Sequence, residues 1–340
     1  MIVDMSQIAQ NKSMREHLPP ISIITITYNG IAEITETMDS VVGQDYPHIQ
    51  YIIIDGASND GTREKIIEYI ASCADIDSRN NGDSKETAFS KETSADSEQY
   101  PLFAKENTQA QSRIYLEATH REKDLTFTFL SEKDSGIYDA MNKGIDLATG
   151  QWCNFMNCGD RFYSPNTLKE FFTHFLQSAQ VSSQAAPQAA PQILYGDAQL
   201  IYDDTHSKIL YASTKPHKYK HHFIHQSAFI ATPLMRAYRY DTGFKIAGDT
   251  DFFAKAYNNG ARFQHIPIVV SNFSLEGVSS KLSWQMFKED CQIGYKYNRL
   301  FPIMHTLKYL FWIIPRVCIR NAIPARFRSQ ARILLGKKTS

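Results

Sequence analysis

The chain has 340 residues, enough to bury a full hydrophobic core in one large domain or two modest domains. Its five cysteines include no C-x-x-C pair, which argues against a disulfide framework and favours reduced thiols in the cytosol. The opening segment 1–20 is polar and lacks the apolar core of a secretory signal peptide.

The formal net charge is zero, but the charges are unevenly placed. Residues 291–340 hold ten Lys or Arg and no Asp or Glu, so residues 1–290 carry 26 basic against 36 acidic side chains. This asymmetry predicts a C-terminal tail that meets an anionic surface, either a membrane or a nucleic acid. A basic tail that is simply solvated is the alternative.

Strands and helices alternate at the start of the chain. The β-branched run "ISIITITYN" (21–29) predicts a strand buried on both faces, and "YIIIDG" (51–56) predicts a second. Apolar residues at helical spacing follow each strand, over 31–42 and 66–70. This order is typical of a parallel α/β sheet.

The middle of the chain is interrupted. The polar stretch 74–113 predicts a disordered insertion or a long surface loop, and "SAQVSSQAAPQAAPQ" (178–192) predicts a linker. Between them, "LTFTFLSE" (125–132) predicts a strand, and a helical pattern covers 137–148. A further strand ends at "MNCGD" (156–160), and Ser164-Pro165 is a typical helix start.

The segment after the linker continues the α/β pattern. Strands are predicted over 193–202, 207–213, 225–231 and 262–273, and a helix is predicted from about Asp249 to Gly260. We therefore expect an N-terminal extension (1–18), one core domain (19–280, with insertions at 74–113 and 178–192) and a helical basic tail (281–340).

Polar and acidic side chains gather where the predicted strands end. In open parallel sheets, ligands bind outside the carboxyl ends of the strands. The chain has neither G-x-x-x-x-G-K-[ST] nor G-x-G-x-x-G, which argues against a phosphate-loop nucleotidase and a standard dinucleotide enzyme. An acidic nucleotide site without glycine loops needs a divalent cation, Mn²⁺ or Mg²⁺, to neutralise the phosphates.

Two stretches carry a family resemblance. "PPISIITITYNGIAEITETMDSVVGQDYPHIQYIIIDGASNDGT" and "SEKDSGIYDAMNKGIDLATGQWCNFMNCGD" resemble the signatures of family 2 glycosyltransferases of the bacterial polysaccharide and lipopolysaccharide type. The resemblance runs from about Pro19 to Ser279. It implies a GT-A-type fold, which is a Rossmann-like, mostly parallel sheet flanked by helices, together with a nucleotide-sugar donor, a divalent cation and inversion at the anomeric carbon.

The resemblance assigns donor-binding roles at the first two strand ends. Tyr28 matches an aromatic residue that stacks on the donor base, with Thr27 and Asn29 beside it. Asp55 matches an aspartate that accepts a hydrogen bond from a uracil N–H. A strand-end tyrosine and an Asp-Gly turn are the structural alternatives.

Further donor contacts are implied near the ribose and the diphosphate, at Asp134 and Asn142. Many relatives carry arginine one residue before this asparagine, where the present chain has Met141. Lys143 is the candidate to replace that charge, unless it is only a solvent-exposed lysine.

The segment "MNCGD" aligns with the family's Asp-x-Asp metal motif in reduced form. Asn157 stands for the first acid and is counted with the donor-binding residues, Gly159 stands for the middle one, and Asp160 remains as the metal ligand. A metal held by so few carboxylates depends more on the donor diphosphate. A Gly-Asp turn between strand and helix is the alternative.

The acceptor side is implied further along the chain. His225 and Gln226 match the acceptor side of the cleft, with His225 also a possible metal contact or a structural histidine. In "KIAGDTDFFAK", Asp249 matches the catalytic base and Asp251 is the second choice for that role. Asp249 could also serve as a helix N-cap.

We therefore expect an inverting, metal-dependent hexosyl- or N-acetylhexosaminyltransferase that takes its sugar from a UDP-sugar. The expected acceptor is a glycan or lipid-linked glycan in cell-surface polysaccharide biosynthesis. The enzyme is expected to be peripheral on the inner face of the cytoplasmic membrane, bound through 296–340, without a nucleic-acid partner. The alternatives are a sugar nucleotidyltransferase and a degenerate, non-catalytic module that binds nucleotide sugars.

Overall fold

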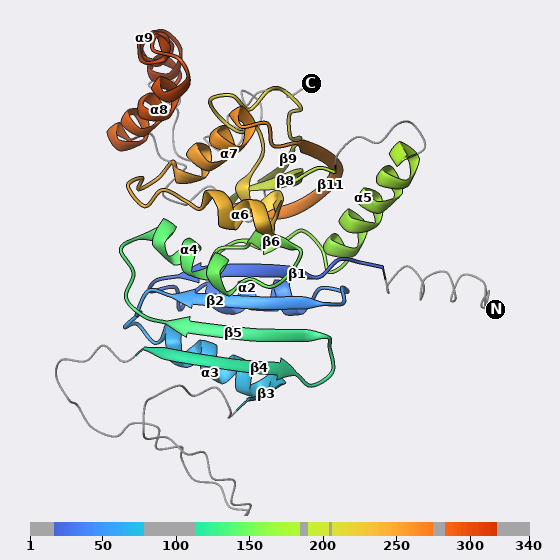
Figure 1. Ribbon diagram of the computed structural model, residues 1–340. Helices are drawn as coiled ribbons and strands as arrows, with labels where there is room; N and C mark the ends of the chain where they lie inside the picture. Colours follow the sequence, from blue (N-terminus) through green and yellow to red (C-terminus); the bar gives the residue numbers. More distant parts are fainter. Residues whose placement is uncertain (1–16, 78–112, 184–189, 204–205, 275–282, 318–340) are drawn as a thin grey trace, which may run out of the picture.

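The structure is a computed structural model that describes residues 17–77, 113–183, 190–203, 206–274 and 283–317 (Figure 1). Within these ranges, eleven strands form one sheet in the order β3-β4-β5-β2-β1-β6-β10-β8-β11-β7, with β9 paired to β8. Strands β5, β2, β1 and β6 are parallel neighbours at its centre. The predicted α/β class with a parallel core is confirmed, and antiparallel strands extend the sheet at both margins.

The elements of the first half of the chain are β1 (Ile21–Thr27), α2 (Ile34–Val42), β2 (Ile49–Asp55), α3 (Thr62–Cys73), β3 (Ala74–Ile76), β4 (Ile114–His120), β5 (Leu125–Ser131), α4 (Ile137–Leu147) and β6 (Trp152–Phe155). Those that follow are β7 (Arg161–Phe162), α5 (Thr167–Ser183), β8 (Ile193–Asp203), β9 (His206–Leu210), β10 (Ala228–Ala231), α6 (Thr232–Tyr238), α7 (Gly248–Asn258), β11 (Phe263–Ser274), α8 (Trp284–Tyr297) and α9 (Phe301–Lys308).

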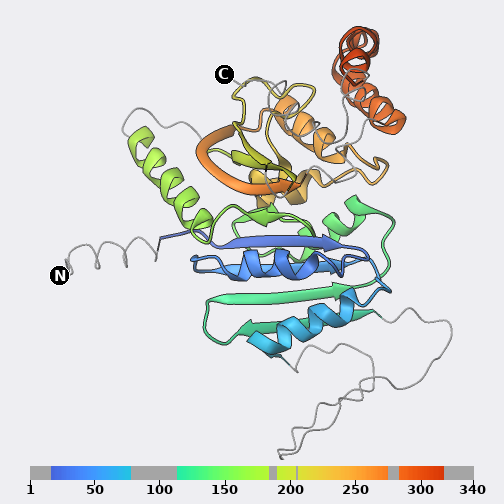
Figure 2. The ribbon, with the colours of Figure 1, turned by 180° about the vertical axis from the view of Figure 1, so that it is seen from behind.

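The central strands are buried on both faces, as their unbroken apolar runs predict. Successive side chains of a strand point to opposite faces. Ile23 of β1 therefore packs with α2 and α3 on one face, whereas Ile24 packs with α4 and α7 on the other. Figures 1 and 2 show these two helical layers from opposite sides. The two cores hold the carboxyl ends of the central strands in fixed register.

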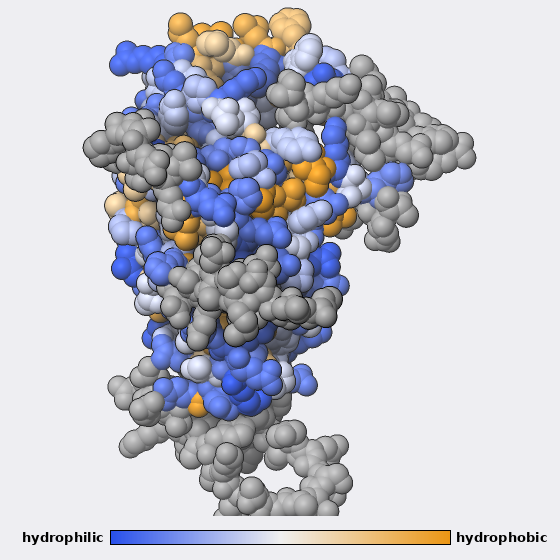
Figure 3. All heavy atoms as spheres, turned by 90° about the vertical axis from the view of Figure 1, so that its right-hand side faces the viewer, coloured by the Kyte–Doolittle hydropathy of each residue, from blue (hydrophilic) through white to orange (hydrophobic). Residues whose placement is uncertain are grey.

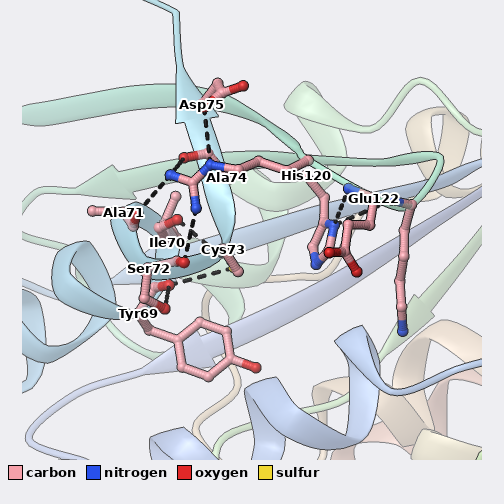
Figure 4. A network of polar contacts seen from close by, with 11 residues as sticks. Tyr69, Ile70, Ala71, Ser72, Cys73, Ala74, Asp75, His120 and Glu122 are labelled. Atoms are coloured by element: carbon pink, nitrogen blue, oxygen red, sulfur yellow. Dashed lines mark hydrogen bonds and ion pairs between the residues drawn. The ribbon is translucent and has the colours of Figure 1, made fainter.

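The predicted insertion 74–113 begins in regular structure, and β4 follows it directly. Its first residues form β3, which pairs with β4, while residues 78–112 lie outside the described part of the chain. Arg121 fixes this junction, because its guanidinium donates to the carbonyls of Ala71, Ser72 and Ala74 at the end of α3 and pairs with Asp75 at 3.0 Å (Figure 4). A cation at a helix C-terminus also complements the helix dipole.

The predicted linker and the predicted tail are partly helical. Helix α5 runs to Ser183, so it includes the first part of the expected linker 178–192; residues 184–189 are not described. In the tail, α8 and α9 are followed by a π-helical turn over Tyr309–Ile313 (η4). None of the helices that the structure describes is both long and apolar enough to span a membrane.

Candidate functional site

The carboxyl ends of the central strands lie side by side. Thr27, Asp55 and Ser131 are register partners at the ends of β1, β2 and β5. Asn29 has a left-handed backbone with φ of 52°, and its N–H donates to Ser58 Oγ at 2.7 Å. The loops after β1 and β2 are therefore joined, and the predicted donor residues share one edge of the sheet.

An exposed aromatic ring and a carboxylate converge on Gly56. The side chain of Tyr28 is 66% exposed, which leaves its ring free to stack on a planar ligand. A Cβ added to Gly56 would lie 2.5 Å from Asp134 Oδ2 and 3.3 Å from Tyr28 Cδ2, so both side chains press against this glycine. Burial raises the pKa of Asp134 above its ordinary value. The predicted residues Tyr28 and Asp134 are thus brought together.

Asp55 is fully buried beneath this surface. Its Oδ2 accepts hydrogen bonds from Ser131 Oγ at 2.7 Å and Ser58 N at 3.0 Å, and its Oδ1 accepts from Ser58 Oγ. Asp55 therefore organises the two loops, whether or not a ligand N–H also reaches it.

Asn142 and Lys143 have protein partners. The Asn142 amide donates to the carbonyl of Tyr240 at 2.9 Å and accepts from its N–H at 2.9 Å. Lys143 Nζ donates to the carbonyl of Lys133 at 2.8 Å and pairs with Glu132 at 2.9 Å. Both side chains position the loop after β5 and the segment that leads to α7.

Asp160 is buried and faces Gln226. Its side chain is 8% exposed, and Gln226 Nε2 donates to its Oδ2 at 2.6 Å. Burial raises the pKa of Asp160 to about 7, against the lowering effect of the bond from Gln226. Nearby, Asn157 Oδ1 is buried and finds no hydrogen-bond donor in the described part of the chain. A desolvated carboxylate and an unsatisfied amide oxygen are suitable ligands for Mg²⁺ or Mn²⁺.

A second carboxylate lies at this position, and the sequence reasoning missed it. Gly159 has φ of 94°, and a Cβ added there would lie 2.9 Å from Glu33 Oε2. The charge of Glu33 also contributes to the raised pKa of Asp160, after burial. Glu33 lies within the first signature stretch, but the resemblance assigns it no role, so only the fold reveals it near the reduced Asp-x-Asp segment.

The described residues include no group of three or more His, Cys, Asp or Glu that could hold a metal ion.

A second cluster of ionisable side chains surrounds Asp249, in the first turn of α7. Burial raises the pKa of its carboxyl, although His225 opposes this. His221 Nε2 lies 3.7 Å from Asp249 Oδ2, and His225 Nε2 lies 2.8 Å from the Tyr240 hydroxyl. Burial lowers the pKa of His221 to about 3 and that of His225 to about 4, so both rings are neutral at pH 7.

Asp249 and Asp251 have different surroundings. Asp251 is 5% exposed and pairs with Lys296 Nζ of α8 at 2.7 Å. Helix α7 begins at Gly248, so Asp249 lies in its first turn and is not the N-cap. A carboxylate held by a lysine is a poorer proton acceptor than one beside neutral histidines.

The turn His225–Ser227 (η2) connects the two acidic groups. Gln226 donates to Asp160, while His225 interacts electrostatically with Asp249. Asn154 Nδ2 holds this turn by donating to the carbonyls of Gln226 and Ala228, each at 2.9 Å. The predicted metal residue and the predicted base therefore lie on either side of one short turn.

Comparison with known proteins gives consistent results. A family model described as glycosyl transferase family 2 matches residues 22–91. A PGL/p-HBAD biosynthesis glycosyltransferase of Mycobacterium bovis is 24% identical over 269 residues, which cover 78% of this chain and 80% of that protein. An uncharacterised glycosyltransferase of Mycobacterium tuberculosis is 26% identical over 243 residues, which cover 70% of this chain and 69% of that protein.

Two solved structures share the fold at low sequence identity. A mannosyltransferase of Pyrobaculum calidifontis, in complex with GDP-Man and Mn²⁺, aligns with a TM-score of 0.51 and 17% identity over 98% of this chain and 86% of its own. S. aureus TarS, in complex with UDP-GlcNAc, aligns with a TM-score of 0.50 and 15% identity over 91% of this chain and 77% of its own.

Proposed function

Because the chain belongs to glycosyl transferase family 2 and is a glycosyltransferase of the GT-A fold, we propose that it moves a sugar from a UDP-sugar to a hydroxyl of a glycan or lipid-linked glycan, with inversion. The observation that carries the proposal is the placement of a buried carboxylate, Asp160, and a partly buried carboxylate, Asp249, on either side of η2. Asp160 follows β6, the parallel neighbour of β1, and Asp249 lies in the first turn of α7.

Asp249 acts as the general base in this reaction. Its raised pKa makes it a stronger proton acceptor than an exposed aspartate. The neutral ring of His221 lies 3.7 Å from the carboxylate and adds no positive charge that would lower its pKa. The carboxylate takes the proton from the acceptor hydroxyl as the oxygen attacks the anomeric carbon. General-base catalysis is typically worth about 10²- to 10⁴-fold in rate.

Asp160, with Asn157 and Glu33 beside it, supports the diphosphate of the donor. A Mn²⁺ or Mg²⁺ ion, when bound, neutralises the diphosphate charge and stabilises the leaving group as a Lewis acid. Tyr28 stacks on the base, and Asp134 approaches the ribose from the loop after β5. Gln226 fixes the orientation of the Asp160 carboxylate through its hydrogen bond.

A donor screen tests the proposal. Purified protein is incubated with UDP-, GDP- and dTDP-sugars, with and without Mn²⁺, and nucleoside diphosphate release is measured. We expect release from one UDP-sugar that depends on the cation. Nucleotide-sugar binding without turnover would favour the degenerate module, for which the Asn157 and Gly159 replacements argue. Formation of a nucleotide sugar from a sugar phosphate and a nucleoside triphosphate would favour the nucleotidyltransferase.

We propose further that helix α9 and the turn η4 hold the enzyme on an anionic membrane beside its acceptor, on the cytoplasmic side. Helix α9 has no buried residue. The exposed apolar residues of this region are Leu300, Ile303, Met304, Leu307, Leu310, Phe311, Trp312 and Ile314. Figure 3 shows apolar residues gathered at the end of the molecule where α9 lies. The Phe311 and Trp312 side chains are 75% and 55% exposed, so neither ring is buried against the rest of the chain.

Basic residues accompany this apolar surface. Lys308 ends α9, and the Arg316 guanidinium lies 4.2 Å from the Trp312 ring centroid. Aromatic and basic side chains in such proximity suit an interfacial helix, and each Lys or Arg near an anionic leaflet is worth about 1 kcal/mol.

Vesicle co-sedimentation tests the membrane proposal. The full chain is compared with one that ends near Asn298, on neutral vesicles and on vesicles with anionic lipid. The full chain should bind the anionic vesicles and be released by salt, and Phe311→Ser should weaken binding. Tyr211→Ser is a matched control, because Tyr211 is 58% exposed on another part of the molecule. Equal sedimentation of the two chains would refute the proposal.

A further inference from the structure

Helix α8 contacts residues 245–247, which lie just before the proposed base Asp249. Glu289, in the middle of α8, is 1% exposed. Its Oε1 accepts a hydrogen bond from Lys245 N at 2.8 Å, and its Oε2 accepts from Ile246 N at 3.0 Å and Ala247 N at 2.8 Å. Gln285, one turn earlier on α8, donates to Oε1 at 2.6 Å. One buried carboxylate thus fixes three consecutive backbone N–H groups.

These three residues immediately precede α7. The N-cap of α7 is Ala247, whose side chain cannot accept a hydrogen bond, although Asp249 Oδ1 accepts from Thr250 N at 2.7 Å within the first turn. A negative charge near a helix N-terminus is favourable. Burial alone would raise the pKa of Glu289, but the bonds from Gln285 and from the backbone outweigh it, and the pKa lies below its ordinary value. Glu289 is therefore ionised, and from a separate helix it accepts from the N–H of this N-cap residue and of the two residues before it.

The same segment is held from the opposite side by α4. The Tyr138 hydroxyl donates to the carbonyl of Ile246 at 2.6 Å. A Cβ added to Gly248 would lie 2.7 Å from the Tyr138 ring, so the backbone at Gly248 packs directly on it. Glu289 and Tyr138 bind opposite polar groups of one peptide segment. The carboxylate of Asp249, one residue further along, has its position set by this pair of contacts.

We propose that Glu289 is a positioning residue for transfer, which holds residues 245–247 so that the Asp249 carboxylate meets the acceptor hydroxyl. This inference rests on the proposed function of Asp249 as the base. It also makes α8 part of the catalytic unit rather than of the membrane-binding tail. A displacement of about 1 Å at a catalytic group can cost about 100-fold in rate, so a modest movement of this segment has a large effect.

A double-mutant cycle tests the inference. Glu289→Gln keeps the shape, removes the charge and leaves one oxygen to accept from three N–H groups. We expect kcat to fall by about 10- to 100-fold, while KM for the donor changes by less than about threefold. In the Asp249→Asn background the same substitution should lower kcat no further, because the group being positioned is already lost.

The controls separate positioning from general stability and from the base assignment. Asp290 lies next to Glu289 on α8, but its Oδ2 lies 3.4 Å from His305 Nε2. Asp290→Asn should therefore leave kcat unchanged. If Glu289→Gln folds poorly, Glu289→Asp keeps the charge with a shorter reach and enters the same cycle. The inference would be overturned if Glu289→Gln lowered kcat equally in the wild type and in Asp249→Asn, or if Glu289→Gln left the kcat of the wild type unchanged. Normal turnover of Asp249→Asn alone would instead overturn the base assignment, and the inference with it.

Discussion

Asp160 should make the metal-free protein less stable as pH rises. Its pKa is about 7 in the folded chain, against an ordinary value of 3.8, because burial disfavours the charged form. The folded state therefore binds a proton more tightly than the unfolded state. This contribution to the free energy of unfolding is fully present below pH 4, and it is lost progressively as the pH rises through 7. The gap between the two pKa values corresponds to about 4 kcal/mol, since one pKa unit is worth about 1.36 kcal/mol.

Asp160→Asn removes this penalty. In the presence of a chelator, the free energy of unfolding of Asp160→Asn should exceed that of the wild type at pH 8 by up to about 4 kcal/mol, and the excess should vanish near pH 4. Added Mn²⁺ should stabilise the wild type at pH 8 through binding to the folded state, but not Asp160→Asn. Urea unfolding at several pH values measures both effects.

Glu68→Gln is the matched control, because Glu68 is exposed on α3. Its unfolding curve should follow that of the wild type at every pH. If the free energies of unfolding of Asp160→Asn and the wild type changed with pH in parallel, the claim that burial disfavours the ionised Asp160 carboxylate would be refuted.

Three further substitutions test other parts of the site. Tyr28→Ala should raise KM for the donor without changing Tm, because stacking of a base on an aromatic ring is worth about 1–3 kcal/mol and the ring is 66% exposed; an unchanged KM would exclude stacking. Gly248→Ala should lower both Tm and kcat, because its Cβ would lie 2.7 Å from the Tyr138 ring, and normal values of both would show that the segment can move. Asp251→Asn should cost about 1–3 kcal/mol of stability by releasing Lys296 and should change kcat by less than about 10-fold; a loss of kcat near the 10²- to 10⁴-fold typical of a missing base would make Asp251 the base instead.

The sequence predicts the central strands well because a strand that is buried on both faces has an unbroken run of apolar residues. The runs around Ile23 and Ile52 are apolar throughout, and β1 and β2 lie where those runs predict. The short strand β3 and the strand β4 were not predicted, because their sequences are mixed in polarity and they pair only with each other and with β5. Their pairing depends on a contact between residues on either side of a long insertion, which no local pattern encodes.

The residues of the candidate site also divide into those that the local sequence reveals and those that only the fold reveals. Residues within motifs, such as Tyr28, Asp160 and Asp249, could be found from spacing and resemblance. Glu33 and Glu289 could not, because each acts across space on a segment far away in the chain. An isolated glutamate in a helical pattern usually lies on a solvated face, and only the packing of α8 against the segment before α7 shows that Glu289 is buried.

A comparison of two variants tests the separate roles proposed for Asp160 in cation-dependent donor binding and for Asp249 as the base. With the donor that the screen identifies, Mn²⁺-dependent donor binding and single-turnover transfer are measured for Asp160→Asn and Asp249→Asn. We predict that Asp249→Asn binds the donor as the wild type does and transfers about 10²- to 10⁴-fold more slowly, whereas Asp160→Asn loses Mn²⁺-dependent binding. Normal transfer by Asp249→Asn, or unchanged Mn²⁺-dependent binding by Asp160→Asn, would contradict this prediction.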